Sequence, residues 1–243
     1  MPYVIRPLML GKMLMNCALM TYMINFEKDL WSPVVSWYIR ADDRHVLIDT
    51  GAPADMIRRY WYREYEEIVT FEAALQSVGI TPDDVNIVIQ THLHFDHCGN
   101  TPKCKNADVI VQADELRFSR NPHPLFYGSY MKEPFFAGVH FREVEGDVEV
   151  LPGIRVIKLP GHSPGTQGIA VQTDVGTAVL SGFCAIRENF SPPEKTRKVW
   201  PVLTPGVHTD SFQAFASAMR VKEIADIIIP THDMESATKK QIP

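Results

Sequence analysis

Residues 92–97 of the chain read His-Leu-His-Phe-Asp-His, which gathers three imidazoles and a carboxylate into six positions. Imidazole and carboxylate are the usual protein ligands of zinc and similar divalent ions. With the His and Asp content of this chain, such a run arises by chance on the order of once in a thousand sequences. The run therefore predicts a metal site, with a solvated polar loop as the alternative.

Further candidate groups share the position of this run relative to the predicted strands. The run itself follows residues 85–90, which have the apolar pattern of a strand. The other groups are Asp49 after residues 45–48, His162 after residues 154–159 and His232 after residues 227–229. Loops at the ends of sheet strands are where sites collect, so neighbouring strands of similar direction would bring these groups to one rim.

The rest of the pattern alternates strands with helices. Residues 70–78 and 211–225 are predicted helices, the second with Asp210 as N-cap and with Phe212, Phe215 and Met219 on one face. Residues 168–173 and 177–181 are predicted to form a hairpin around a three-residue loop. This alternation indicates an α/β or α+β fold. Because no linker or repeat divides the chain, we expect a single domain over residues 1–243.

Charge, cysteine content and apolar patterning indicate which partners and which cellular location to expect. The net charge of −5 gives no basic footprint for nucleic acid. The four cysteines have no framework spacing and are expected to be reduced. No apolar run reaches the roughly 20 residues that cross a bilayer, and residues 8–23 lack a signal-peptide cleavage site. We therefore expect a cytoplasmic protein that binds neither membranes nor nucleic acid; a homodimer is left open, with residues 59–63 as a lid or an interface.

The number of candidate ligands indicates how many ions to expect. A catalytic zinc takes about three protein ligands and water, whereas six candidates are available: His92, His94, Asp96, His97, His162 and His232. In extended backbone His92 and His94 point the same way, so they can share an ion, while Asp96 and His97 cannot both reach it easily. Two divalent ions, zinc or alternatively iron or manganese, account for the set better than one.

The chain resembles the metallo-β-lactamase superfamily, and within it the N-acyl homoserine lactone lactonases. The resemblance rests on the run at 92–97, the Asp49-Thr50-Gly51 turn, Gly161-His162-Ser163-Pro164-Gly165, Glu188-Asn189-Phe190 and His232-Asp233. It implies an α+β fold, a four-layer αβ/βα sandwich with two metals at one edge of the sheets. It would assign His92, His94 and His162 to one ion and Asp96, His97 and His232 to the other.

One segment departs from this family. Most members carry a metal-bridging aspartate after a late strand, but residues 179–185 here read Val-Leu-Ser-Gly-Phe-Cys-Ala. Cys184 is therefore a candidate ligand, because thiolate binds zinc well, with a buried packing residue as the alternative. The lactonase tyrosine beyond that aspartate is also missing. Tyr127 and Tyr130 are candidate substitutes for binding the substrate, and the alternative is that they pack over the site or line a surface for a partner.

These features predict a metal-dependent hydrolase of the lactonase kind that acts on a small molecule. Two ions would supply hydroxide at neutral pH to open a lactone or cleave another small ester or amide, with Asp96 as a catalytic proton shuttle. Asp49 and Asp233 are expected behind the ligands, where they would orient the imidazoles. The alternatives are a metal- and ligand-binding sensor or effector with little turnover and an iron-dependent redox enzyme on the same scaffold.

Overall fold

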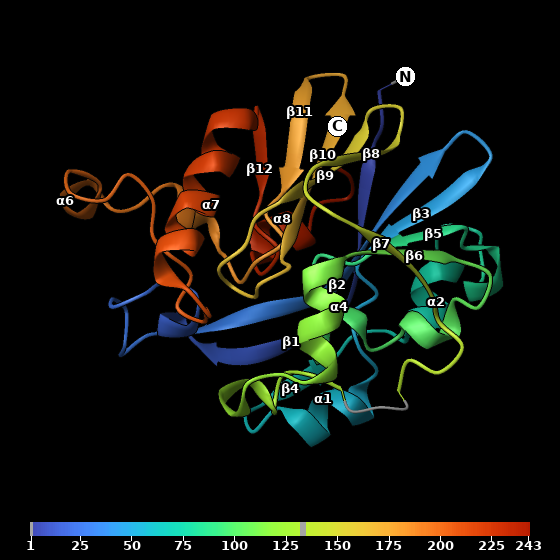
Figure 1. Cartoon of the computed structure of the whole chain (residues 1–243), viewed down its shortest axis with the longest axis horizontal. Coiled ribbons are helices and arrows are strands. Elements are labelled where there is room, and N and C mark those ends of the chain that lie inside the picture. The colour runs from blue at the N-terminus through green and yellow to red at the C-terminus, as the bar shows by residue number, and fades with distance from the viewer. Residues whose placement is uncertain (1, 132–134) are drawn as a thin grey trace.

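The computed structural model describes residues 2–131 and 135–243 and contains two mixed β-sheets (Figure 1). The first sheet has the order β4 (Tyr65–Glu67), β1 (Ile5–Asn16), β2 (Asp29–Ala41), β3 (Arg44–Ile48), β5 (Ile87–Ile89), β6 (Asp108–Gln112) and β7 (His140–Val144). The second has the order β12 (Ile227–Ile229), β11 (Gly176–Leu180), β10 (Gln167–Thr173), β9 (Ile154–Lys158) and β8 (Val148–Leu151).

The helices are short except for one near the C-terminus. The α-helices are α1 (Ala54–Tyr60), α2 (Phe71–Gln76), α3 (Phe95–Cys98), α4 (Ala113–Arg120), α5 (Arg187–Phe190), α6 (Glu194–Arg197), α7 (Ser211–Ile224) and α8 (Met234–Ala237). The 3₁₀ turns are η1 (Cys17–Leu19), η2 (Pro82–Asp84), η3 (Thr101–Lys103) and η4 (Pro124–Phe126). No helix in the described ranges is long and apolar enough to cross a membrane.

Alternation along the strands separates the layers. Ile48 in β3 and Ile89 in β5 join a core cluster with Val156 and Leu180 of the second sheet. Leu47, which points to the opposite face, joins a second cluster that includes residues of α1 and α2. Both faces of these strands are buried, which explains their continuous apolar sequences.

The outer face of the second sheet is covered by α7. Val179 of β11 belongs to a cluster with Ala218 and Val221 of α7, whereas its neighbours Ala178 and Leu180 face the first sheet. The order of layers is therefore helices, sheet, sheet, helix (Figure 1). The predicted four-layer α+β sandwich is confirmed.

The strand directions bring the predicted loops to one edge. β3, β5 and β6 are parallel neighbours, so their carboxyl ends meet. In the second sheet β12 is parallel to β11, and β10 runs antiparallel to both β11 and β9. The segments after β9, β11 and β12 therefore leave at a common edge of that sheet, as the sequence pattern predicts.

Two local predictions need correction. Asp210 caps α7 as predicted, but Phe212 in its first turn is 87% exposed and does not share the buried face. The hairpin between β10 and β11 has a loop of two residues, because Gly176 at φ +119° pairs with Thr173 and belongs to the strand. Glycine tolerates this positive φ without steric cost.

Candidate metal centre

The His92–Cys98 segment changes conformation at its middle. His92 follows β5 outside any helix or strand, and His94 is the N-cap of α3 with extended backbone, φ −68° and ψ 151°. Asp96 and His97 then lie in the single helical turn of α3. Since side chains of an extended stretch and of a helical turn project differently, this change divides the run into two pairs.

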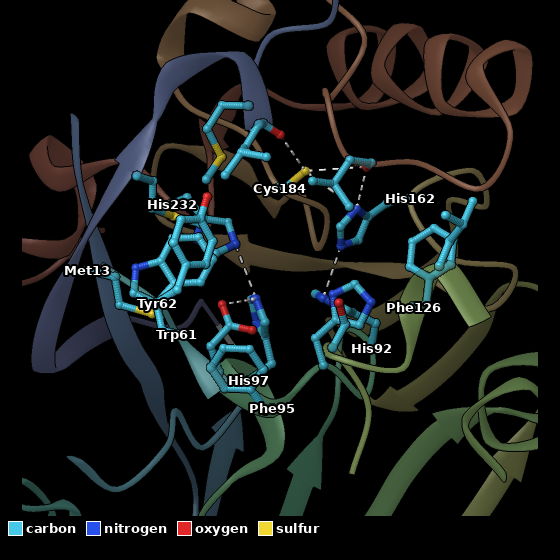
Figure 2. Close-up of a pocket in the computed structure, with 18 residues that line it drawn as sticks. Met13, Trp61, Tyr62, His92, Phe95, His97, Phe126, His162, Cys184 and His232 are labelled. Carbon is cyan, nitrogen blue, oxygen red and sulfur yellow. Dashed lines mark hydrogen bonds and ion pairs between the residues drawn. The ribbon is translucent and has the colours of Figure 1, made fainter. Parts of the chain in front are cut away.

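Each pair is completed by a histidine from the second sheet. His92 and His94 meet His162, which follows β9, and Asp96 and His97 meet His232, which follows β12. Figure 2 shows His92 facing His162 and His97 facing His232. In each group of three, the potential ligand atoms lie within 4.8 Å of one another. The structure thus brings together the six predicted residues in the two predicted sets.

The spacing of the imidazole nitrogens suits a tetrahedral divalent ion. Nε2 of His92 lies 3.2 Å from Nε2 of His162, and Nε2 of His97 lies 3.2 Å from Nε2 of His232. Zinc–nitrogen bonds of 2.0–2.1 Å with tetrahedral angles place two nitrogens about 3.4 Å apart. Nε2 of His94 is buried and has no hydrogen-bond partner among the described residues, which leaves its lone pair for a cation. The donor set therefore fits divalent metal ions.

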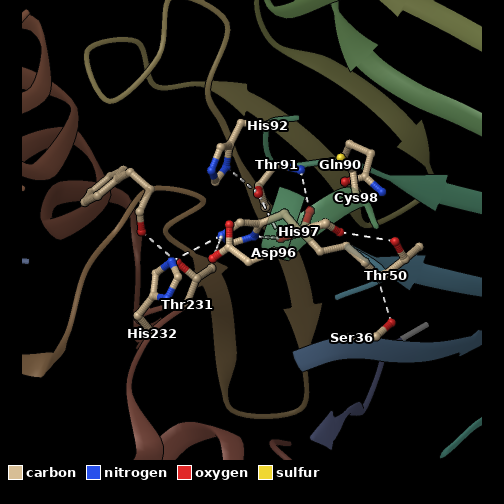
Figure 3. Close-up of polar contacts among 12 residues, drawn as sticks. Ser36, Thr50, Gln90, Thr91, His92, Asp96, His97, Cys98, Thr231 and His232 are labelled. Atoms are coloured by element: carbon tan, nitrogen blue, oxygen red, sulfur yellow. Dashed lines mark hydrogen bonds and ion pairs between the residues drawn. The ribbon is translucent and has the colours of Figure 1, made fainter. Parts of the chain in front are cut away.

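Asp49 orients a candidate ligand of each group, one of them through the contact between Thr91 and His92 that Figure 3 shows. Its buried carboxylate accepts hydrogen bonds from Nδ1 of His97 at 2.7 Å and from the amide and hydroxyl of Thr91. Because the Thr91 hydroxyl donates to Asp49, its oxygen accepts from Nδ1 of His92, at 3.0 Å. Both imidazoles are thereby held with Nε2 toward the site, the arrangement expected for Asp49 and typical of metal-binding histidines.

The remaining rings are held by backbone and hydroxyl groups. Nδ1 of His162 donates to the carbonyl of Val207 at 2.7 Å. Nδ1 of His232 lies 2.8 Å from the buried hydroxyl of Ser32 in β2. Sequence reasoning missed Ser32, since a serine inside a strand carries no signal that it faces a histidine 200 positions away.

Burial and neighbouring carboxylates determine the pKa values of the five imidazoles. Burial lowers the pKa of His162 to about 4 and that of His232 to about 3, and it holds the pKa values of His92 and His94 well below their usual range. Burial alone would also lower the pKa of His97, but the carboxylates of Asp96 and Asp49 raise it to about 9. The four imidazoles with lowered pKa values are neutral and keep the lone pair that metal binding requires, whereas His97 has to release a proton from Nε2 when it binds a cation.

Cys184 lies beside the site but outside both groups of ligand atoms. Its Sγ is 3.4 Å from Nδ1 of His162, the nitrogen turned away from His92, and 3.3 Å from the carbonyl oxygen of Leu19. Burial raises the pKa of this thiol to about 12. The predicted alternative of a buried packing residue agrees better with this geometry than the ligand role.

Asp233 does not have the predicted orienting role. Its carboxylate accepts from the amides of Ser236 and Arg187 and caps α8. The first amides of a helix lack partners within the helix and attract a nearby carboxylate, so the local cap takes this side chain away from the histidines.

An apolar pocket of about 270 Å³ opens over the two groups of ligands (Figure 2). Besides the histidines and Asp96, its walls include Met13, Met15, Leu19, Met20, Trp61, Tyr62, Phe95, Leu125, Phe126 and Val207. The methionine-rich N-terminal segment and residues 61–62 thus form part of the pocket wall.

Neither tyrosine predicted to contact a substrate lines this pocket. Tyr130 is buried, and its hydroxyl donates to Glu115 at 2.8 Å. Tyr127 is 54% exposed and lies outside the residues that form the pocket walls. Among the described residues, Tyr62 is the only tyrosine that lines this pocket.

The chain is similar in sequence to N-acyl homoserine lactonases. The chain is 30% identical over 223 residues to the N-acyl homoserine lactonase AiiA of Bacillus thuringiensis subsp. kurstaki, covering 84% of this chain and 82% of the relative. A relative from Bacillus cereus with the same activity name is 29% identical with the same coverage. These relatives confirm the expected enzyme class, a metal-dependent hydrolase of the lactonase kind.

Solved structures of N-acyl homoserine lactone hydrolases also have a fold similar to that of this chain. A quorum-quenching N-acyl homoserine lactone lactonase superimposes with a TM-score of 0.79 at 27% identity, covering 98% of this chain and 95% of that one. An N-acyl homoserine lactone hydrolase with N-hexanoyl-L-homoserine bound at its catalytic metal centre has a TM-score of 0.77 at 26% identity, with coverage of 97% and 95%. The fold and the His/Asp groups together imply divalent metals. Because the model of the family described as the metallo-beta-lactamase superfamily matches residues 29–232, the chain belongs to that superfamily.

Proposed function

We propose that the chain uses two divalent metal ions to hydrolyse the lactone ring of N-acyl homoserine lactones. The observation that carries this proposal is the pair of three-ligand groups, each with two Nε2 atoms 3.2 Å apart, at the floor of an apolar pocket. The lactonase names of relatives that cover most of the chain support the substrate class.

In this proposal His92, His94 and His162 hold one ion, and Asp96, His97 and His232 hold the other. Bound divalent cations polarise a carbonyl and lower the pKa of water toward neutrality, so that hydroxide is available at pH 7. Asp96 is the only acid among the six ligands, so the ligand set brings a single negative charge. With two divalent cations bound, the site would carry a net positive charge and would favour the negative charge that develops on the carbonyl oxygen.

Asp96 would also transfer a proton during the reaction. A carboxylate has two oxygens, so one could be a ligand while the other receives the remaining proton of the added hydroxide and delivers it to the leaving alkoxide oxygen, which leaves a carboxylate and an alcohol. In a lactone the leaving oxygen stays tethered to the acyl group, which keeps it within reach of this carboxylate. The half-buried position of Asp96 at the pocket floor is compatible with such a transfer.

The apolar residues of the pocket walls would bind the acyl chain of the substrate. Met13, Met20 and Trp61 offer an apolar surface for an acyl chain, with Leu125 and Phe126 among the other walls. Burial of each methylene against such a surface contributes about 0.8 kcal/mol. The same surface limits access of water other than the nucleophile.

Elemental analysis of the purified full chain, run beside hydrolysis of acyl homoserine lactones of short and long chains, tests the proposal. We expect two metal equivalents and release of acid from the lactones. His94→Ala and His232→Ala should each lose one equivalent, with a fall in turnover that exceeds the 10–100-fold typical for loss of an outer partner. His140→Ala, at an exposed position in β7, is the matched control.

Other outcomes would replace this function. Metal without turnover of any lactone would indicate a sensor or effector, a candidate favoured by the absence of a carboxylate in residues 179–185. Iron with consumption of oxygen would indicate redox chemistry. A chain that binds no metal would overturn the proposal.

A further inference from the structure

Glu115 is a fully buried carboxylate that belongs to neither group of metal ligands. It lies in the first turn of α4, and four donors surround it. Oε1 accepts from the Leu93 amide at 2.9 Å and from the Tyr130 hydroxyl at 2.8 Å. Oε2 accepts from the Ser163 hydroxyl and from the Gly165 amide at 3.2 Å. A buried charge is tolerated only when it is paired or hydrogen-bonded in this way.

The donors come from the loops that carry the first group of imidazoles. Leu93 lies between His92 and His94, and Ser163 and Gly165 follow His162 directly. One carboxylate therefore bonds the backbone of the loop after β5 with one oxygen and the backbone of the loop after β9 with the other. These loops belong to different sheets, and the Nε2 atoms of His92 and His162 meet 3.2 Å apart between them.

Close packing reinforces this link. A Cβ at Gly165 would come within 2.1 Å of the Glu115 backbone nitrogen, so the His162 loop rests directly on the start of α4. Tyr130, the fourth donor, packs its ring edge-on against the ring of His94, with centroids 4.8 Å apart. Glu115 thus contacts the surroundings of all three imidazoles of the first group.

The second group is held by other residues. Asp49 orients His97, and Ser32 contacts His232. Glu115 makes no hydrogen bond to the loop that carries His232 among the described residues. The two groups therefore depend on Glu115 to different degrees.

We infer that Glu115 is a positioning residue that sets the spacing between the His92/His94 loop and the His162 loop, and thereby the affinity of the first metal position. This inference rests on the two-metal site proposed above. It predicts a selective effect: loss of the Glu115 charge weakens metal binding by His92, His94 and His162 and leaves binding by Asp96, His97 and His232 unchanged.

Glu115→Gln is a sharp test because of how the donors are arranged. The Ser163 and Tyr130 hydroxyls could rotate and accept from an amide NH₂ group, but the amides of Leu93 and Gly165 can only donate. Since these two amides face different oxygens, the NH₂ group of the introduced glutamine would oppose one of them in either orientation. One of the two ligand loops must then move away from α4.

The experiment measures metal affinity by competition with a chromophoric chelator in two backgrounds. In His232→Ala the intact first group holds the remaining ion, and adding Glu115→Gln should weaken it by about tenfold or more. In His94→Ala the intact second group holds the remaining ion, and the same addition should change its affinity by less than about threefold. Asp114→Asn is the matched control, because Asp114 lies in the same turn but pairs with Arg117 and Lys158.

Ser163→Ala is a milder second variant for the case that Glu115→Gln fails to fold. It removes one donor from Oε2 and should also weaken the first metal position selectively, whereas Ser119→Ala, which removes a buried hydroxyl bonded to Leu116 within α4, should not. Equal weakening of both positions, or a lower melting temperature with both affinities unchanged, would reduce Glu115 to a structural role and overturn the inference. If the parent chain still binds two metal ions in that case, only the inference about Glu115 fails and the proposed function remains supported.

Discussion

The carboxylate of Asp49 accepts a hydrogen bond of 2.7 Å from Nδ1 of His97, 48 positions further along the chain. Through Thr91 the same carboxylate also orients His92, so one buried acid serves a ligand of each group. The backbone of Asp49 has φ +55°, which is uncommon for a residue other than glycine. The turn after β3 therefore adopts a costly conformation that places this carboxylate between the two ligands.

Asp49→Asn should weaken metal binding with little change in backbone geometry. Asparagine tolerates positive φ, but its NH₂ group cannot accept from His97 or from Thr91. We expect affinity for metal to fall by about 10–100-fold, the usual effect of losing an outer partner. Competition with a chromophoric chelator measures the metal affinity of the variant.

Asp42→Asn provides the control, since Asp42 has φ +52° and lies in the exposed turn between β2 and β3. An equal loss of metal affinity in both variants would show that the effect does not come from the hydrogen bonds of Asp49.

Cys184→Ser should leave two metal equivalents in place. The Sγ atom contacts His162 on its Nδ1 side, so replacing the thiol does not remove an atom from either group of ligands. Cys104→Ser, at a buried position in the core cluster around α2, controls for the cost of burying a hydroxyl, about 1–3 kcal/mol. Loss of one equivalent from Cys184→Ser alone would establish the thiolate as a ligand.

The candidate ligand residues could be selected from sequence because their signals are local. A run such as His92–His97 is rare by chance, and strand ends such as Ile89 can be recognised from a short apolar pattern. Parallel pairing of β3 with β5 then follows from ordinary rules of sheet topology and brings Asp49 next to Thr91.

The residues that orient these ligands could not be predicted in the same way. Glu115 has the sequence context of an ordinary acid in the first turn of a helix, and its burial follows only from the packing of α4 against two loops. Ser32 contacts a histidine 200 positions away. Asp233 was misassigned because a helix cap and an orienting carboxylate have the same local sequence, and only the fold decides between them.

Leu125→Ala should reduce the preference for long acyl chains. Leu125 lines the pocket although its side chain is 85% exposed, so its truncation should cost little stability. Loss of its apolar contact, about 1 kcal/mol, predicts a rise in KM of about fivefold for a long-chain lactone and little change for a short one.

Steady-state kinetics with both lactones checks this, and Val199→Ala, which truncates another exposed apolar side chain outside the pocket, is the control. A uniform effect on both substrates would place the acyl chain away from Leu125.

Gly165→Ala should disturb the metal site although residue 165 supplies no ligand. Its Cβ would lie 2.1 Å from the Glu115 nitrogen, and backbone cannot yield as a flexible side chain does, so the loop that carries His162 must shift. Because the Nε2 atoms of His162 and His92 are already spaced for one ion, a shift of this loop should lower affinity at the first position by about tenfold or more. Gly128→Ala meets no atom within 4 Å and should bind metal as the parent chain does, which chelator competition on both variants can establish. Parent-like affinity in Gly165→Ala would mean that the His162 loop reaches its position independently of α4.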